Sequence, residues 1–367
     1  MRALTRSVGM GWGLLLAACA GSGTAWAHDG EHDEGGADER GDTRVLCPRP
    51  GSRLAKRLPR TESDLRRLKC HSFFAPGGVD DAFVTSTVGS TTAAALLSYP
   101  GAIATDGTPY DLLLVGASLQ GRGSIQFAGW AMIYAHIAGN VVVGSNIDSA
   151  LSVGAIGSGN WDVGVGVKLF RIERTGTQMS VRGKFVGDAG VHIRPGTLVE
   201  VFDTRASAGE IPREGDVATA ITNSTELGGG GSLNFAQAFA SFASLQASFQ
   251  MTGGPTQGEE ISQDANGDFV KTPVTGSYMA IEPGVALTLD GWPRFPVAFQ
   301  VEYAPAWRRD TVGAASADQL DHNLLGGIFY SGSPDVVIGL RGGGVVATSL
   351  PTPVLRLVAG LELQVYL

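Results

Sequence analysis

The 367-residue chain is poor in charge, since Asp, Glu, Lys and Arg make up 17% of it against roughly 25% in a typical soluble domain. Acids outnumber bases by 35 to 27, so the chain lacks the basic surplus that a nucleic-acid partner requires. Past the N-terminus it has no run of about 20 apolar residues, which excludes a polytopic helical membrane protein. The apolar share of 43% is nevertheless too high for a chain that is disordered throughout.

Cysteine is also scarce, with three residues: Cys19, Cys47 and Cys70. Cys47 and Cys70 lack the CxxC spacing of a metal site, and we expect neither a metal nor a cofactor. In an exported protein an isolated pair is most simply a disulfide. Two unrelated free thiols are the alternative.

The N-terminus has the pattern of a secretory signal peptide. Two arginines precede an apolar run over residues 8–20, and Ala25 and Ala27 supply the small residues of a cleavage site. The run is too short to span a membrane. We therefore expect residues 1–27 to be removed.

A second processing signal overlaps the first. Residues 16–19 match a bacterial lipobox, in which Cys19 would become the lipidated first residue. Both interpretations export the chain, and the lipobox implies a bacterium.

Two segments of opposite charge follow. Residues 28–43 carry seven acids and one arginine and read as a flexible acidic leader. Residues 44–70 carry nine bases against two acids, which suits contact with anionic lipid heads, a polyanionic cell-wall partner or the leader itself. We expect residues 44–109 to be a basic, disulfide-stapled periplasmic or plug segment, with 71–109 as the plug or as a lead-in.

From residue 110 onward, apolar and polar residues alternate with a period of two, which predicts strands. The last segment is the clearest. One face of it carries Leu355, Leu357, Ala359, Leu361, Leu363, Val365 and Leu367. Its 13 residues are long for a soluble strand and suit a tilted strand that crosses a bilayer.

Twelve such segments predict an antiparallel, up-and-down transmembrane β-barrel over residues 110–367, with the N-terminal part as a periplasmic extension. Their limits are 110–121, 123–137, 141–154, 160–173, 178–187, 229–239, 244–253, 277–289, 296–306, 322–330, 335–347 and 354–367. Short turns are expected at 138–140, 174–177, 240–243, 290–295 and 331–334, and long polar connections at 188–228, 254–276 and 307–321. Short turns on one side and long loops on the other are typical of outer-membrane barrels, and an even strand count places both ends of the barrel in the periplasm.

Two other folds compete with this interpretation. Residues 123–147 and 227–258 carry no charge, as membrane helices would, but Gly and polar side chains dilute both runs. A soluble, secreted all-β domain would place charges on the outward strand faces, and the faces assigned here have none.

The strand–turn–strand unit over residues 134–144, and the texture of 162–171 and 321–339, resemble Gram-negative outer-membrane barrels loosely described as transporters of hydrophobic or aromatic compounds. The resemblance covers about residues 110–367. It implies a location in the bacterial outer membrane, contact with its lipid, and a porin-like channel or facilitator for small solutes, including apolar ones. A closed barrel with a structural, envelope-anchoring or binding role is the alternative.

The C-terminal strand is similar to the signal that the barrel assembly machinery recognises in this class. The positions that carry the similarity are Gly360, Leu363, Val365, Tyr366 and Leu367. The sequence departs from the usual pattern at its last residue, where Leu367 replaces the common Phe or Trp.

We expect no catalysis. His136, His192 and His322 have no Ser or Asp at a diagnostic spacing, and the GxSxG, HExxH and P-loop patterns are absent.

The inward-facing positions of the predicted strands carry charges instead, and these are the candidate pore-lining residues. They are Asp162, Lys168, Arg182, Lys184, Glu282, Glu302, Arg341, Arg356 and Glu362. One interpretation is a transverse field across a narrow pore. The other is a set of interior ion pairs that fill a small barrel and keep it closed.

Overall fold

The computed structural model describes residues 66–69, 71–103, 109–146, 149–150, 153–193, 221–263, 269–291, 295–313, 315–333, 336–349 and 355–367. The predicted signal peptide, the acidic leader, Cys19, Cys47 and Cys70 lie outside these residues. Among the described residues, no helix is long and apolar enough to cross a membrane.

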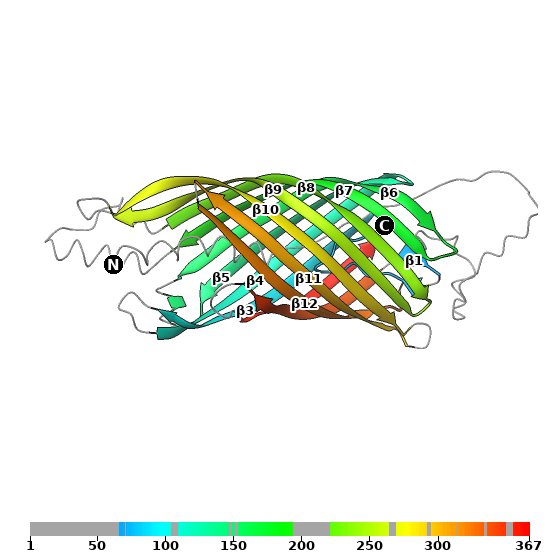
Figure 1. Ribbon diagram of the computed structural model, residues 1–367. Helices are drawn as coiled ribbons and strands as arrows, with labels where there is room; N and C mark the ends of the chain where they lie inside the picture. The colour runs from blue at the N-terminus through cyan, green and yellow to red at the C-terminus, as the bar shows by residue number, and fades with distance from the viewer. Residues whose placement is uncertain are drawn as a thin grey trace, which may run out of the picture.

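The chain forms a closed barrel of twelve antiparallel strands, in which each strand pairs with its neighbours in sequence and β14 pairs with β3 to close the ring (Figure 1). The strands are β3 (Thr87–Ile103), β4 (Pro109–Ala128), β5 (Ala131–Gly144), β6 (Ala155–Ile172), β7 (Thr177–Ile193), β8 (Ile221–Ala240), β9 (Ala243–Gln263), β10 (Phe269–Asp290), β11 (Val297–Val312), β12 (Ala315–Tyr330), β13 (Val336–Thr348) and β14 (Leu355–Tyr366). Two short strands, β1 (Arg67–Leu68) and β2 (His71–Ser72), pair with each other. The predicted fold class is therefore confirmed.

Burial alternates along the strands with the predicted period of two. In β5 the odd positions from Ile133 to Val143 are exposed, while Tyr134, His136 and Asn140 are buried. Large apolar side chains thus face outward around the barrel, and polar ones face the lumen. Exposing such a surface to water would cost free energy in proportion to its apolar area, whereas contact with lipid chains would not.

An aromatic belt marks one edge of the apolar surface, at the end where the short turns lie. Its exposed members are Phe127, Trp130, Phe170, Phe239, Phe242, Phe295 and Tyr330. Aromatic rings collect at the membrane–water boundary because they are apolar and polarisable at once. A closed barrel with a lipid-facing belt and such a girdle is an outer-membrane protein, located in the bacterial outer membrane.

The barrel begins earlier than predicted, at Thr87 rather than at residue 110, because β3 supplies its first strand. Residues 87–103 therefore belong to the wall and not to a plug or lead-in. The alternation is hidden in this strand, since both faces carry mainly Ser, Thr, Ala and Gly. Small residues on both faces give no contrast for a period-two pattern to show.

The region from residue 110 to 154 holds two strands where three were predicted. The turn falls at residues 129–130, and the predicted turn at 138–140 is the middle of β5. Gly139 there faces outward, and an added Cβ would meet nothing within 4 Å. It is a lipid-facing strand residue, so its appearance as a turn signal was misleading. The missed β3 and the extra segment cancel, which leaves the total at twelve.

Much of the three predicted long loops is also strand. β8 already begins at Ile221. β9 extends to Gln263, and β10 begins at Phe269. β11 and β12 are joined by a tight turn after Val312. β10 has 22 residues, about twice the 9–11 that cross a bilayer. The polar stretches are ladders that continue beyond the lipid belt, and Figure 1 shows β9 and β10 projecting at the end opposite β1.

Candidate functional site: the lumen and its plug

The segment before β3 runs inside the barrel. Residues 66–69 and 71–86, called the plug below, are buried almost throughout, including Leu68, Phe73, Asp81 and Phe83. β1 and β2 lie at the end where β14 finishes (Figure 1). The first strand of the barrel, β3, starts at this end, and the last strand, β14, finishes there. In outer-membrane barrels with an even number of strands, this end faces the periplasm. The luminal plug therefore consists of residues 66–69 and 71–86, whereas residues 87–103 of the expected plug segment form β3.

Apolar contacts seat the plug at two places. Phe73 and Phe83 pack on each other and, with Leu68, on Ala236 and Ala238 of β8. These alanines face inward at positions where larger side chains would leave no room for the phenyl rings.

On the opposite wall, the Phe74 ring stacks on Phe329 of β12 at 5.3 Å and contacts Ala298 and Val337. The plug therefore spans the lumen from β8 to β12.

A carboxylate on β11 holds the centre of the plug. The backbone N–H groups of Gly77 and Gly78 donate to Glu302, each at 2.7 Å from Oε2. Arg341 of β13 lies 3.6 Å from the same carboxylate and donates to the Ala75 carbonyl at 2.8 Å. This group of contacts is called the latch below.

The latch continues across the wall as a chain of alternating charges. Arg341 pairs with Glu362 of β14 at 3.1 Å, and Glu362 also pairs with Arg122 of β4. Arg122 has to cross β3 to reach β14. Gly89 on β3 makes this possible, because a Cβ there would lie 3.0 Å from the Arg122 Nε.

The backbone carbonyls of the plug accept hydrogen bonds from side chains on other strands. Arg182 of β7 donates to the Asp81 carbonyl at 2.6 Å and to the Phe83 carbonyl at 3.2 Å. Gln246 of β9 donates to the Phe74 carbonyl at 2.7 Å. The wall thus replaces the partners that a sheet would give this extended chain.

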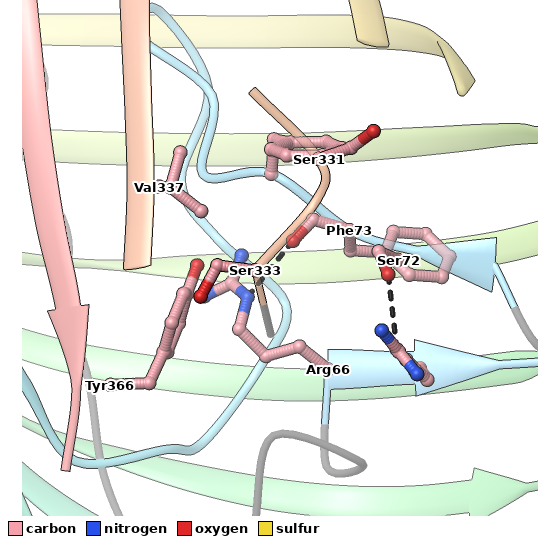
Figure 2. Close-up of a pocket in the computed structure, with 9 residues that line it drawn as sticks. Arg66, Ser72, Phe73, Ser331, Ser333, Val337 and Tyr366 are labelled. Carbon is pink, nitrogen blue, oxygen red and sulfur yellow. Dashed lines mark hydrogen bonds between the residues drawn. The ribbon is translucent and has the colours of Figure 1, made fainter. Parts of the chain in front are cut away.

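Polar contacts also involve the side chains of the plug. Arg66 pairs with Asp81 within the plug, and Asp80 accepts from Ser232 of β8. At the periplasmic mouth, Arg66 lies over the ring of Tyr366 at 5.3 Å (Figure 2). The cavity between these residues and Ser331 has a volume of about 20 Å³, which is room for one water molecule.

The nine predicted pore-lining residues all occupy inward-facing strand positions, yet they perform different tasks. Arg182, Glu302 and Arg341 bind the plug directly, and Glu362 does so through Arg341. None of these four forms the transverse field of an open pore in this arrangement. They form interior ion pairs, as in the interpretation of a barrel filled by its own charges, and they also contact the plug.

The other five lie elsewhere in the lumen. Lys184 donates to Gln250 at 2.9 Å, and Gln250 donates to Glu282, so a relay joins β7, β9 and β10. Asp162 lies 3.2 Å from His136, and Arg356 pairs with Asp321 at 2.8 Å. The backbone N–H of Lys168 donates to the Trp130 carbonyl near the periplasmic turn.

The extracellular half of the lumen has two unlike sides. On β3 to β6, aliphatic side chains form a buried inward-facing cluster made of Leu97, Leu112, Leu114, Val142, Val153 and Ile156. On β8 to β14, Arg308 pairs with Glu226 at 2.5 Å and with Asp310 at 2.8 Å, while Arg356 binds Asp321. An apolar wall therefore faces a charged one.

Sequence reasoning missed Arg122, Arg308 and Asp321 as luminal charges. Arg122 fell between two predicted strands, and Arg308 and Asp321 fell within or at the edge of a predicted loop. Correct strand limits would have placed all three on inward positions.

The three histidines have separate partners. His136 lies against Asp162, the Nε2 of His192 lies 2.6 Å from the Val153 carbonyl, and the Nδ1 of His322 lies 2.6 Å from the Tyr303 hydroxyl. Within the described ranges they do not converge on one acid, and no group of three or more His, Cys, Asp or Glu is placed to hold a metal ion.

The C-terminal strand takes its place beside β3. Leu363 and Val365 face outward, and Tyr366 turns inward against the plug. Gly360 lies inward, where a Cβ would be 2.8 Å from the Thr92 carbonyl, and the terminal Leu367 is exposed. Recognition of this strand by assembly machinery stays a prediction.

No protein-family model matches the chain, and no curated protein sequence matches it significantly. Among solved structures, the translocator domain of the autotransporter NalP from Neisseria meningitidis aligns with a TM-score of 0.49 and 9% identity, over 78% of this chain and 90% of that one. An outer-membrane channel from Pseudomonas putida F1 aligns with 0.48 and 7%, over 80% and 100%. The Pseudomonas putida toluene transporter TodX aligns with 0.35 and 10%, over 77% and 89%. These values do not indicate what this barrel does.

Proposed function

We propose that the protein is an outer-membrane channel for small solutes, in which the plug closes the periplasmic end and must move for solute to pass. One observation carries the proposal: the bore is wide enough to hold a whole polypeptide segment. In the narrowest barrels, side chains of the strands fill the interior. Here the wall encloses a passage, and a separate segment closes it.

The mode of attachment supports a movable plug. Hydrogen bonds and ion pairs from β7, β9, β11 and β13 hold much of it, and water can replace such partners when the segment shifts. The extracellular half offers an apolar side and a charged side. Solutes with an apolar part and a polar part match both, and we propose these as the substrate class.

The second candidate is a closed barrel with a structural or binding role. The latch favours it, because Glu302, Arg341, Glu362 and Arg122 form one continuous network from the plug to the barrel seam. Such a network stabilises a closed interior as well as it holds a gate.

An engineered disulfide between the plug and the wall, called the lock below, distinguishes the channel from the closed barrel. A Cβ on Gly78 would lie 3.0 Å from the Cβ of Ala304, so a shift of about 0.5 Å brings the pair to the Cβ–Cβ separation of a disulfide, roughly 3.5–4.5 Å. The Gly78→Cys/Ala304→Cys pair, with Cys47 and Cys70 replaced by Ser, should abolish conductance in planar bilayers when oxidised and recover it on reduction. Gly342→Cys/Ala359→Cys is the matched control, since it joins two wall strands at 3.9 Å without touching the plug.

Each result decides between the candidates. Conductance that the oxidised lock leaves unchanged means that solute passes without plug movement. A protein that conducts in neither state, and that stays silent when Glu302 is replaced by Ala, is the closed barrel of the second candidate.

A further inference from the structure

One histidine of the plug sits where a positive charge cannot be tolerated. The side chain of His71 on β2 is fully buried, with an exposed fraction of 0%. It belongs to the part of the plug that packs on β8 and on the turn to β9. Its ring meets Phe73 edge-on at 5.1 Å, beside the cluster of Leu68, Phe83 and Ala236.

The imidazole forms a hydrogen bond with the turn between β8 and β9. Its Nδ1 lies 3.3 Å from the carbonyl oxygen of Ser241, in the turn between β8 and β9, and donates to it as the neutral tautomer. Its Nε2 is buried and has no hydrogen-bond partner among the residues that the structure describes. Protonation would place a second N–H donor and a charge at this atom, with no acceptor in reach.

The charged groups near the site come from the plug and from the wall. Within the plug, Arg66 pairs with Asp81, while Arg67 donates to Ser72 and Lys69 is exposed.

On the wall, Arg171 of β6 pairs with Glu173 and donates to the Arg67 carbonyl. Asp290 ends β10, and its N–H donates to Phe242 in the same turn as Ser241. A carboxylate directed at His71 would raise the pKa of the imidazole. Burial instead lowers this pKa to about 4, and the Ser241 carbonyl opposes the shift only in part.

We propose that His71 makes the plug acid-sensitive: protonation of its imidazole frees the β1–β2 hairpin from the β8–β9 turn and opens the periplasmic end of the lumen. This inference names the regulation of the channel and therefore rests on the proposed function. The geometry supports it, because the docked site suits the neutral ring and the undocked ring is free to take a proton from water.

The direction follows from linkage. A histidine whose pKa is lowered in the docked state stabilises docking above its ordinary pKa, and this contribution is lost as the pH falls below it. With an undocked pKa of about 6.5, the undocked fraction should rise about 20-fold between pH 7 and pH 5.

Amide hydrogen exchange of residues 73–86 measures undocking directly. The full-length protein in liposomes is compared at pH 7 and pH 5, after correction for the intrinsic pH dependence of exchange. We expect the corrected rates to rise about 20-fold in the wild type. In His71→Gln, which keeps an N–H donor for Ser241 but does not titrate in this range, they should not change with pH.

His136→Gln and His192→Gln are the matched controls, since both residues lie in the lumen away from the plug hairpin. They should keep the wild-type response. His71→Phe, which keeps the ring contact with Phe73, serves as a second variant if the Gln variant already exchanges fast at pH 7.

Wild-type rates that do not change between pH 7 and pH 5 would overturn the inference, as would a full response in both His71 variants. Conductance measured in parallel keeps the two proposals apart. An acid response in exchange without any conductance supports His71 and removes the channel. Conductance without an acid response in exchange supports the channel and removes the role of His71.

Discussion

The two halves of the lumen are built differently. In the periplasmic half, wall side chains bind the backbone of another segment, as Glu302 binds the amides of Gly77 and Gly78. In the extracellular half, wall side chains bind each other, as Arg308 binds Glu226 and the aliphatic cluster packs on itself. A contact between wall and plug breaks when the plug moves, whereas contacts within the wall persist. In the proposed channel, the periplasmic half would control whether the bore is open, and the extracellular half would control what enters.

The largest effect should come from the latch. Glu302→Ala leaves two plug amides and Arg341 without their buried carboxylate, at a cost to plug docking of about 3 kcal/mol or more. We expect the undocked fraction to rise at least about 100-fold. Amide exchange of residues 73–86 and bilayer conductance report it.

The control is Glu259→Ala, since this half-exposed residue at the extracellular end pairs with Lys271 at 3.3 Å. Its loss should leave both readings unchanged. An equal response in the two variants would contradict the division of the lumen into a movable half and a fixed one.

The aliphatic cluster should give the next effect, on the barrel and not on the plug. Leu114→Ala opens a gap beside Leu97 and Ile156 and should cost about 2–4 kcal/mol. The temperature at which the folded band converts to the unfolded band in SDS gels should fall, with plug exchange unchanged. Leu119→Ala on the same strand faces lipid and should shift that temperature little, because acyl chains fill the space.

A smaller effect should follow from luminal charge. Lys184→Gln removes a luminal cation whose side chain donates to the neutral Gln250. In the open Glu302→Ala background, the cation-to-anion permeability ratio should rise a few-fold, about 1 kcal/mol or less. The reversal potential in a salt gradient measures it. Lys271→Gln, near the extracellular tip of β10, should leave the ratio unchanged.

How far the sequence could predict this protein depends on the contrast between neighbouring residues. β14 alternates between large apolar and polar residues, and its predicted limits of 354–367 lie within one residue of those observed. β6 alternates from Trp161 on, and its predicted end lies within one residue of Ile172, although the strand starts five residues earlier than predicted, at Ala155. β3 has small residues on both faces and was missed, and Gly139 read as a turn although it lies within a strand.

The candidate site was predictable to a similar degree. All nine charges fell on inward positions, because position parity decides that in any strand. Their partners were not predictable. Glu302 and Gly77 are 225 residues apart, and no local pattern joins them.

The sequence by itself determined that alternating strands close into a barrel with an apolar outer face, since lipid on one side and polar groups on the other demand that alternation. Only the tertiary structure decided what occupies the bore. The plug and the latch depend on strands far apart in the chain facing one point inside the ring, and such a meeting point exists only once the ring is closed.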